Sequence, residues 1–204
     1  MKIVCIGRNY ADHAKELNNP VPEQPIIFCK PDSSIIQKGK PFFYPNFSEN
    51  IHYEVEIVIR INRLGKHIAE RFAHKYYNEI TLGIDFTARD IQQECKNKGL
   101  PWERAKSFDG SAPIGQFIEL SEFLNPINNL NFNLFKNGQP VQTGCTKDML
   151  FSVDQLIAEV SKTMTLKIGD LIFTGTPAGV GPVAIGDVLI GKLEEKEILK
   201  VPIR

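Results

Sequence analysis

The sequence has few cysteines and no long apolar run, and both shortages exclude classes of protein. Its 204 residues contain four cysteines, none of them in a Cys-x-x-Cys pair. We therefore expect no disulfide framework and no zinc site, but reduced and mostly buried thiols in a cytoplasmic protein. No apolar run approaches the roughly 18 residues of a membrane-spanning helix. The N-terminus turns polar too early for a signal peptide.

An excess of basic charge is also missing. The chain carries 24 Lys and Arg against 24 Asp and Glu, so its net charge is zero. Nucleic-acid and membrane-surface partners select for a basic excess, and we expect neither. Hydrophobic residues make up 42% of the chain, which is enough for a single domain over residues 1–204, with residues 1–45 as an N-terminal segment.

The stretch Ile51–Ile61 alternates in steps of two, which is the period of a β-strand, and it places Glu54 and Glu56 on the same face. Same-face neighbours lie roughly 6–7 Å apart, so the two carboxylates would share one small volume. They raise each other's pKa unless a cation lies between them. An oxygen-only ligand set favours Mg²⁺, Mn²⁺ or Ca²⁺. The alternative is a solvated strand face with its charges in water.

Asp85 stands at a second boundary that suggests a site. It ends a predicted strand, Glu79–Asp85, and a predicted helix follows as far as Lys98. Thr87 and Asp90 have the spacing of a capping box for that helix. An Asp at the end of a strand, beside a helix N-terminus, is well placed to face a ligand. The alternative is an Asx-turn.

A short predicted helix, Ala11–Leu17, carries His13 and Glu16 three residues apart on one face. A carboxylate beside an imidazole orients the ring and raises its basicity, as a general base requires. The alternative is an ordinary exposed pair, worth a few tenths of a kcal/mol.

Two lysines have different expected environments. Lys30 follows an apolar island, Ile26–Phe28, and the default for its type is exposure on the surface. Lys106 lies in a segment that ends in small residues before Pro113, so we expect it to be less solvated than most lysines.

The remaining pattern predicts many short strands and a few helices. Asn137-Gly138 predicts a hairpin turn within Leu130–Val141, and Ser152 with Gln155 predicts a capping box. The glycine-rich loop at residues 174–182 lacks the Gly-Lys-Ser/Thr of a phosphate-binding loop. The other predicted elements are helices at His67–Tyr77 and Ser152–Lys162 and strands at Lys2–Gly7, Gly169–Phe173, Gly186–Gly191 and Ile198–Ile203. The sum is a mainly-β α+β domain.

Several motifs resemble the fumarylacetoacetate hydrolase family, almost from end to end of the chain, and they occur in the family's order. The chain looks most similar to the short, single-domain branch of acylpyruvases and oxaloacetate decarboxylases. The matching segments are Gly7-Arg8-Asn9-Tyr10-Ala11-Asp12-His13, Lys30-Pro31, His52-Tyr53-Glu54-Val55-Glu56, Asp85-Phe86-Thr87-Ala88-Arg89-Asp90, Gly99-Leu100-Pro101-Trp102, Ala105-Lys106-Ser107-Phe108-Asp109 and Thr174-Gly175-Thr176-Pro177.

The resemblance implies a β-roll core with a few peripheral helices, a homodimer, and a role for each site residue. Glu54, Glu56 and Asp85 would ligate Mg²⁺ or Mn²⁺, with Ca²⁺ as a substitute in crystals. His13 and Glu16 would form a catalytic dyad on a lid, and Lys106 would be the third catalytic residue. The residues implied to bind substrate are Arg8, Tyr10, Lys30, Arg89, Gln92 and Thr176.

The activity implied by the resemblance is metal-dependent chemistry on small 2-oxo acids. Hydrolytic cleavage of the C–C bond of acylpyruvates and decarboxylation of oxaloacetate would both pass through a pyruvate enolate held at the metal. One alternative is an isomerase and decarboxylase acting on 2-hydroxyhepta-2,4-diene-1,7-dioate. Another is a metal-binding protein whose catalytic site is vestigial.

Overall fold

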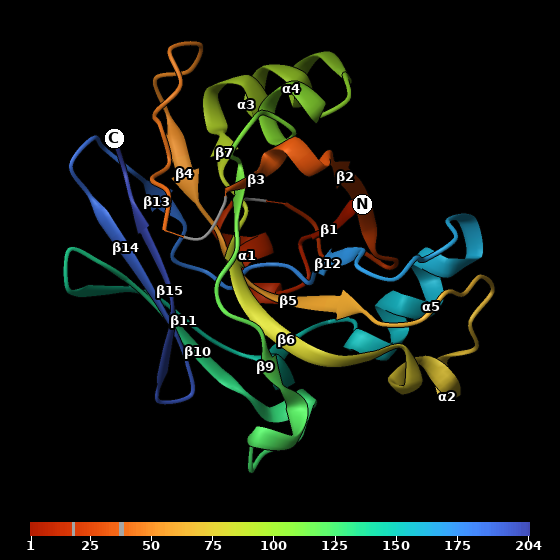
Figure 1. The fold of residues 1–204 in the computed structure, drawn as a ribbon. Helices are drawn as coiled ribbons and strands as arrows, with labels where there is room; N and C mark the ends of the chain where they lie inside the picture. Colours follow the sequence, from red (N-terminus) through yellow and green to blue (C-terminus); the bar gives the residue numbers. More distant parts are fainter. Residues whose placement is uncertain (18, 37–38) are drawn as a thin grey trace.

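The computed structural model describes residues 1–17, 19–36 and 39–204. In these ranges strands form four sheets, and the helices lie at the periphery (Figure 1). This is the mainly-β α+β architecture that the sequence predicts. None of the helices in the described ranges is long and apolar enough to span a membrane.

The largest sheet has six strands in the order β2-β1-β12-β5-β6-β9. Its strands are β1 (Ile3–Gly7), β2 (Ile26–Lys30), β5 (Val55–Ile61), β6 (Tyr77–Ile84), β9 (Ile118–Glu119) and β12 (Leu171–Phe173). β12 lies between β1 and β5; it runs parallel to β1 and antiparallel to β5. Because β1 is an interior strand, the N-terminal segment is part of the main sheet.

A four-stranded sheet packs against the first, in the order β11-β10-β14-β15. Its strands are β10 (Asn131–Lys136), β11 (Gln139–Cys145), β14 (Val188–Leu193) and β15 (Lys196–Pro202). The predicted hairpin turn between β10 and β11 is confirmed, since Asn137 and Gly138 have φ of 53° and 81°. Two successive positive φ angles characterise the tight hairpin turn that Asn-Gly favours.

Two small sheets complete the set, and one of them corrects a prediction. They contain β13 (Gly181–Pro182), β4 (Ile51–Tyr53) and β7 (Thr87–Ala88) in one, and β3 (Ile35–Ile36) with β8 (Ala112–Pro113) in the other. The single strand predicted at Ile51–Ile61 is wrong, because it divides at Glu54 into β4 and β5. β4 pairs with β13 and β7, whereas β5 pairs with β12 and β6, so the chain changes sheets at Glu54.

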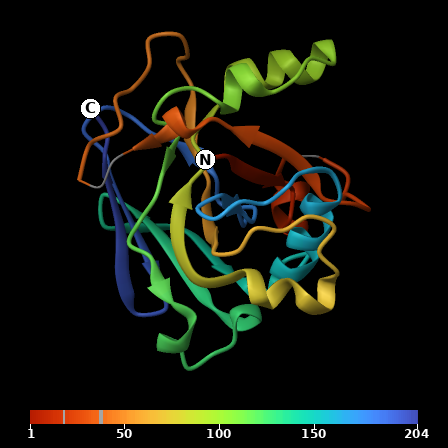
Figure 2. The ribbon, with the colours of Figure 1, turned by 45° about the vertical axis from the view of Figure 1, so that its right-hand side comes forward.

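Four of the five α-helices in the described ranges gather at two ends of the molecule, and α1 lies between them (Figure 1). Figures 1 and 2 show α3 with α4 at one end and α2 beside α5 at the other. Their bounds are α1 (Ala11–Glu16), α2 (Glu70–Ala73), α3 (Arg89–Lys98), α4 (Glu103–Lys106) and α5 (Val153–Thr163), with 3₁₀ turns at Asp32–Ser34, His74–Tyr76, Leu120–Glu122, Ile127–Asn129 and Thr146–Asp148.

One predicted helix agrees with the structure and another does not. The capping box of Ser152 and Gln155 opens α5 as predicted. The helix predicted at His67–Tyr77 is wrong, because only Glu70–Ala73 is α-helical and a 3₁₀ turn follows. His67 has φ of 53°, a left-handed conformation that cannot continue a right-handed helix.

The capping box predicted for α3 is also wrong. Ala88 occupies the N-cap position, and no side chain caps the helix. Thr87 lies in β7, where its hydroxyl faces the acidic cluster described below, and Asp90 accepts a hydrogen bond from the Ser48 hydroxyl at 2.7 Å. Gly99 ends the helix in the left-handed region, as expected for a C-terminal glycine.

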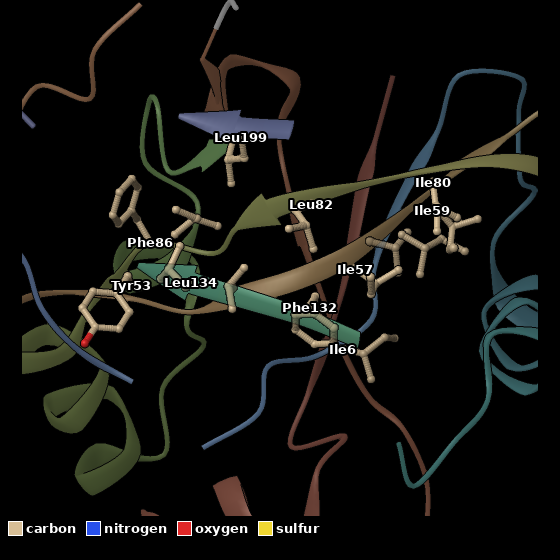
Figure 3. Packing of buried hydrophobic residues seen from close by; sticks show 14 of the residues in the cluster. Ile6, Tyr53, Ile57, Ile59, Ile80, Leu82, Phe86, Phe132, Leu134 and Leu199 are labelled. Carbon is tan, nitrogen blue, oxygen red and sulfur yellow. The ribbon is translucent and has the colours of Figure 1, made fainter. Parts of the chain in front are cut away.

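The main core lies between the two large sheets, where side chains from β5 and β6 meet those of β10 and β15. Figure 3 shows Ile57, Ile59, Ile80 and Leu82 with Phe132, Leu134 and Leu199. Val58, between two of these residues on β5, belongs instead to a second cluster on the opposite face of the sheet, with Ile3 and Phe173. Because side chains alternate along a strand, Glu56 of β5 lies on the Val58 side.

Candidate active site

Three buried carboxylates converge at the place where the chain changes sheets. Glu54, Glu56 and Asp85 are only 5%, 2% and 1% exposed, and each offers one oxygen within 4.8 Å of the others. The Asp85 amide donates to the Glu54 carbonyl at 2.8 Å, which fixes the end of β6 beside the break between β4 and β5. The alternative of a solvated strand face is therefore wrong.

Two buried lysines neutralise part of this cluster. The Lys106 ammonium lies 2.9 Å from Glu54 Oε2 and 2.6 Å from Asp85 Oδ2, and it donates to the Thr87 hydroxyl at 2.6 Å. Lys30 Nζ lies 2.8 Å from the other Asp85 oxygen, Oδ1. Lys30 is 1% exposed, so the alternative of a surface lysine is wrong, and the expected burial of Lys106 is confirmed.

The two glutamates differ in how easily they ionise. Burial alone would raise the pKa of Glu54, but the charges of Lys106 and Arg89 hold that pKa well below its usual range. Burial and the charges of Asp85 and Glu54 raise the pKa of Glu56 well above its usual value, against the Gly175 N–H that donates to it at 2.7 Å. The cluster therefore holds more negative charge than its nearest cations stabilise.

This donor set fits a hard divalent cation. The donors are carboxylate oxygens, which Mg²⁺, Mn²⁺ and Ca²⁺ prefer. Asp85 Oδ1 is buried and has no hydrogen-bond partner in the described part of the chain, since its approach to Lys30 is not directed as a hydrogen bond. Glu56 has a raised pKa and forms no ion pair within the described residues, and a bound cation would stabilise its ionised form.

His13 and Glu16 face this cluster from α1. His13 Nδ1 lies 3.3 Å from Glu16 Oε2, which leaves Nε2 as the free ring nitrogen. His13 is 5% exposed, so the alternative of an ordinary exposed pair is wrong. Burial lowers the pKa of His13, against the opposing charges of Glu54 and Glu16. A histidine that stays neutral at pH 7 can accept a proton.

Backbone groups from distant loops hold α1 in place. The helix has no side-chain cap, but the Glu16 carboxylate accepts from the Gly179 N–H at 3.0 and 3.2 Å. Gly179 has φ of 98°, and a Cβ there would lie 2.4 Å from the Val141 carbonyl oxygen. Only glycine brings its N–H to Glu16 in this way. Asn9, just before the helix, bonds the Phe151 backbone and the Thr174 carbonyl.

The structure brings most of the predicted site residues into one cavity. It is lined by the three carboxylates, His13 and Lys106, together with Arg8, Arg89, Gln92 and Thr176. Glu16 lies behind His13. Tyr10 and Lys30 do not line the cavity, because Tyr10 turns its hydroxyl into the interior and Lys30 lies behind Asp85. The cavity measures about 30 Å³, so a substrate enters only if α1 or the side chains around it move.

The cavity also contains residues that the sequence reasoning missed. Lys96, Trp102 and Phe28 line it as well. Lys96 lies four residues after Gln92 and seven after Arg89 on α3, so helical spacing from those two predicted residues would have identified it. Trp102 stood in a family-like segment with no role assigned, and no local signal marks Phe28.

Comparison with known proteins agrees with the resemblance noted from the motifs. The family described as fumarylacetoacetate (FAA) hydrolase C-terminal matches residues 2–200. The mitochondrial oxaloacetate tautomerase FAHD1 of Homo sapiens is 42% identical over 91% of this chain and 83% of its own length. The oxaloacetate tautomerase YcgM of Escherichia coli (strain K12) is 40% identical over 92% of this chain and 86% of its own length.

Solved structures share the fold over the whole chain. Fumarylpyruvate hydrolase from Pseudomonas aeruginosa, in complex with Mn²⁺ and pyruvate, has a TM-score of 0.93 at 34% identity and covers 100% of this chain and 89% of its own. The 5-carboxymethyl-2-hydroxymuconate delta-isomerase from Mycobacterium smegmatis has a TM-score of 0.87 at 34% identity, covering 99% and 78%. The β-roll fold expected from the motifs is thereby confirmed.

Proposed function

Because the chain belongs to the fumarylacetoacetate hydrolase family, we propose that it is a divalent-metal-dependent enzyme that interconverts the keto and enol forms of oxaloacetate. The observation that carries the proposal is the His13–Glu16 pair, which faces Lys106 and three buried carboxylates across one cavity. Relatives at 40–44% identity that carry the name oxaloacetate tautomerase support the choice of substrate.

The proton transfer falls to His13. His13 Nδ1–H donates a hydrogen bond to the Glu16 carboxylate. The lone pair of the neutral ring is therefore on Nε2, which can remove a proton from C3 of the keto acid. The C3–H electrons form the C2=C3 double bond, and the carbonyl oxygen takes up a proton from the imidazolium. The reaction therefore releases no net proton, and His13 returns to its neutral form.

Lys106 stabilises the negative charge that develops on the 2-oxo oxygen. Burial would lower the pKa of Lys106, but Asp85 and Glu54 raise it above its usual value, so the group stays an ammonium. A fixed cation that already stands where charge develops contributes about 10²–10³ in rate in comparable sites. Arg89, Gln92 and Thr176 line the same cavity and hold the substrate.

The proposed cofactor is Mg²⁺ or Mn²⁺, held by Glu54, Glu56 and Asp85. When bound, such an ion polarises the 2-oxo group as a Lewis acid. The buried oxygen-donor set and the Mn²⁺ in the Pseudomonas aeruginosa structure support this assignment.

The second candidate reaction is cleavage of a C–C bond in an acylpyruvate, and the similarity to a fumarylpyruvate hydrolase favours it. His13 would then activate water instead of removing a carbon-bound proton. Decarboxylation of oxaloacetate needs only the stabilised enolate, so Lys106 would support it without His13.

One set of assays tests the proposal. The enol band of oxaloacetate in the ultraviolet reports tautomerisation, pyruvate release reports decarboxylation, and loss of acetylpyruvate and fumarylpyruvate reports cleavage. We expect tautomerisation to be the fastest with Mg²⁺, and to stop with a chelator. Fast cleavage of an acylpyruvate, together with a keto–enol exchange that the enzyme does not accelerate, would replace the first candidate with the second. Inactivity in all four assays would refute both candidates.

We also propose a homodimer, as the family resemblance implies. Phe43 and Phe47 are 72% and 49% exposed beside a hollow of about 570 Å³ that also includes Phe108, and such apolar surface often marks contacts between chains. Sedimentation at micromolar concentration should give about twice the 23.0 kDa chain mass. A fully active monomer would contradict the proposal.

The cytoplasmic location expected from the sequence stays a prediction that cell fractionation tests.

A further inference from the structure

Two cations in the cavity lack the carboxylate partners that the others have. Lys30 and Lys106 pair with Asp85, and Lys106 and Arg89 pair with Glu54. Arg8 and Lys96 line the same cavity but form no ion pair within residues 1–17, 19–36 and 39–204. The three remaining residues, Asn18, Gln37 and Lys38, carry no carboxylate.

The charges around the cavity therefore divide into two groups. In the first group, Lys30, Lys106 and Arg89 pair with Asp85 and Glu54, and within the described residues Glu56 has no ion-pair partner. Arg8 and Lys96 form the second group: burial lowers the pKa of Lys96, the charge of Arg8 lowers it further, and Glu54 opposes this shift without pairing with either cation. Both side chains are partly buried. Partly buried cations are costly unless an anion pairs with them, so this pair suits an anionic ligand.

Two aromatic rings lie between Lys106 and Lys96. Lys106 Nζ lies 5.3 Å from the centre of the Phe28 ring, and Lys96 Nζ lies 5.9 Å from the centre of the Trp102 ring. The two rings meet edge to face with their centres 6.0 Å apart. A ligand lying along these two rings has one end at Lys106 and the acidic cluster and the other end at Lys96.

The backbone at Arg8 gives a separate observation. Its φ of 59° places a non-glycine residue in the left-handed region. That conformation is unfavourable for a residue with a Cβ, and such outliers concentrate at functional sites. It occurs where β1 gives way to α1, between the main sheet and the helix of the catalytic dyad.

We infer that Lys96 and Arg8 form a subsite for a second carboxylate, so that the enzyme selects 2-oxo dicarboxylates over 2-oxo acids with an uncharged tail. The inference rests on the proposed function for the position of the 2-oxo acid end, which lies at Lys106 and the carboxylate cluster. Lys96 gives the far carboxylate a charge-assisted hydrogen bond, and Arg8 offers a planar donor pair that matches a carboxylate. A ligand with an uncharged tail leaves both cations without a partner.

A binding experiment tests this subsite without turnover. 2-Oxoglutarate and 2-oxopentanoate have the same five-carbon chain and differ only in a terminal carboxylate or methyl group, and calorimetry in Mg²⁺ measures the affinity of each. We expect the wild type to bind 2-oxoglutarate at least tenfold more tightly. Lys96→Met should bring the ratio close to one by weakening 2-oxoglutarate alone, and Lys96→Arg should retain most of the preference.

Lys98→Met is the matched control, because Lys98 lies on the same helix but is exposed and paired with Glu94. It should leave the ratio unchanged. Equal affinities in the wild type, or a ratio that survives Lys96→Met, would overturn the inference. Since the readout is binding, it stands even if oxaloacetate proves to be a poor substrate. Conversely, tautomerase activity that is indifferent to Lys96→Met in both KM and kcat would leave the proposed function intact and remove the subsite.

Discussion

The two halves of the site are built in opposite ways. On the carboxylate side, Glu54, Glu56 and Asp85 lie on or between strands of the central sheets. Buried lysines pair with Glu54 and Asp85, and the Gly175 N–H donates to Glu56. On the opposite side, which we propose as a lid and call the lid side, His13 and Glu16 lie on the six-residue helix α1, which has no side-chain cap. Isolated helices of this length are unstable in water, so α1 depends on Asn9 and Gly179 for its place.

This difference separates the tasks of binding and proton transfer. Charged groups that must hold a metal and stabilise an enolate need fixed positions, since preorganisation makes them effective. A base that must admit substrate to a cavity of about 30 Å³ needs to move. We therefore expect a substitution that breaks an ion pair on the carboxylate side to change stability together with activity, and substitutions on the lid side to change activity alone.

The largest effect should come from the lid side. His13→Gln keeps the size of the side chain and a donor for Glu16 but removes the base. Tautomerisation should fall by roughly 10²–10⁴, the usual worth of a general base, while the urea midpoint stays close to that of the wild type. Decarboxylation, which needs no base, should fall much less. Lys15→Ala, on an exposed position of the same helix, is the control.

If His13→Gln lowers both rates by the same large factor, the histidine acts on a step that the two reactions share. The separation between a binding side and a proton-transfer side would then be wrong.

On the carboxylate side, Lys106→Met should damage the fold as well as the chemistry. Removing one partner of a buried ion pair leaves its carboxylates uncompensated, which costs about 3–5 kcal/mol in comparable cases. Urea unfolding measures this loss, and Mg²⁺ should restore part of it by replacing the missing charge. Lys98→Met removes only an exposed i,i+4 pair, which contributes little to stability, and serves as the control. An unchanged urea midpoint in Lys106→Met would contradict this description of the carboxylate side.

Glu56→Gln should separate metal binding from stability. Because burial and neighbouring anions raise the pKa of Glu56, the neutral amide should leave the metal-free protein at least as stable as the wild type. Metal affinity should fall at least tenfold in calorimetry, since one anionic ligand is lost. Wild-type affinity in this variant would remove Glu56 from the metal site.

The smallest expected effect is a shift in a pH profile. His13 must be neutral to act as a base, so kcat is lost as the pH falls through its pKa. Burial lowers that pKa from the ordinary 6.5, and the acid limb of kcat should therefore lie below pH 6.5. Glu16→Gln removes a charge that opposes this shift, so the limb should move further toward acid, by less than about one pH unit. If kcat is instead lost at a pH above 6.5, a group other than His13 controls the acid limb of the profile.

The sequence predicted the carboxylate side well because its signals are local. The alternation predicted that Glu54 and Glu56 face one volume, and both line one cavity even though the strand breaks at Glu54; Asp85 directly follows the end of β6. The break between β4 and β5 was not predictable, since it depends on which strands pair on either side of Glu54. The predicted capping box at Thr87 is wrong for a related reason. The Thr87 hydroxyl donates to Glu54 and accepts from Lys106, so it does not cap the helix.

The burial of Lys30 and the contacts that hold α1 in place could not be predicted from the sequence, because they depend on the folded chain. Nothing local distinguishes Lys30, which is buried against Asp85, from a surface lysine. The Gly179 N–H donates to Glu16, which is distant in the sequence, and its φ of 98° together with the nearby Val141 carbonyl explains why a glycine stands there. The motifs implied reactions on 2-oxo acids, but tautomerisation entered only with the relatives' names, because neither spacing nor charge distinguishes it from decarboxylation.

The place of β12 between β1 and β5 decides when this protein can become active during its synthesis. The ribosome delivers β1 and β5 long before β12, and pairings between such distant segments form slowly. Gly175 and Gly179, which bond Glu56 and Glu16, follow directly after β12. Until that strand inserts, a nascent chain has open strand edges at β1 and β5 and an unassembled site. A chain whose synthesis stops before β12 should therefore be bound by chaperones or degraded by proteases, and it should have no catalytic activity.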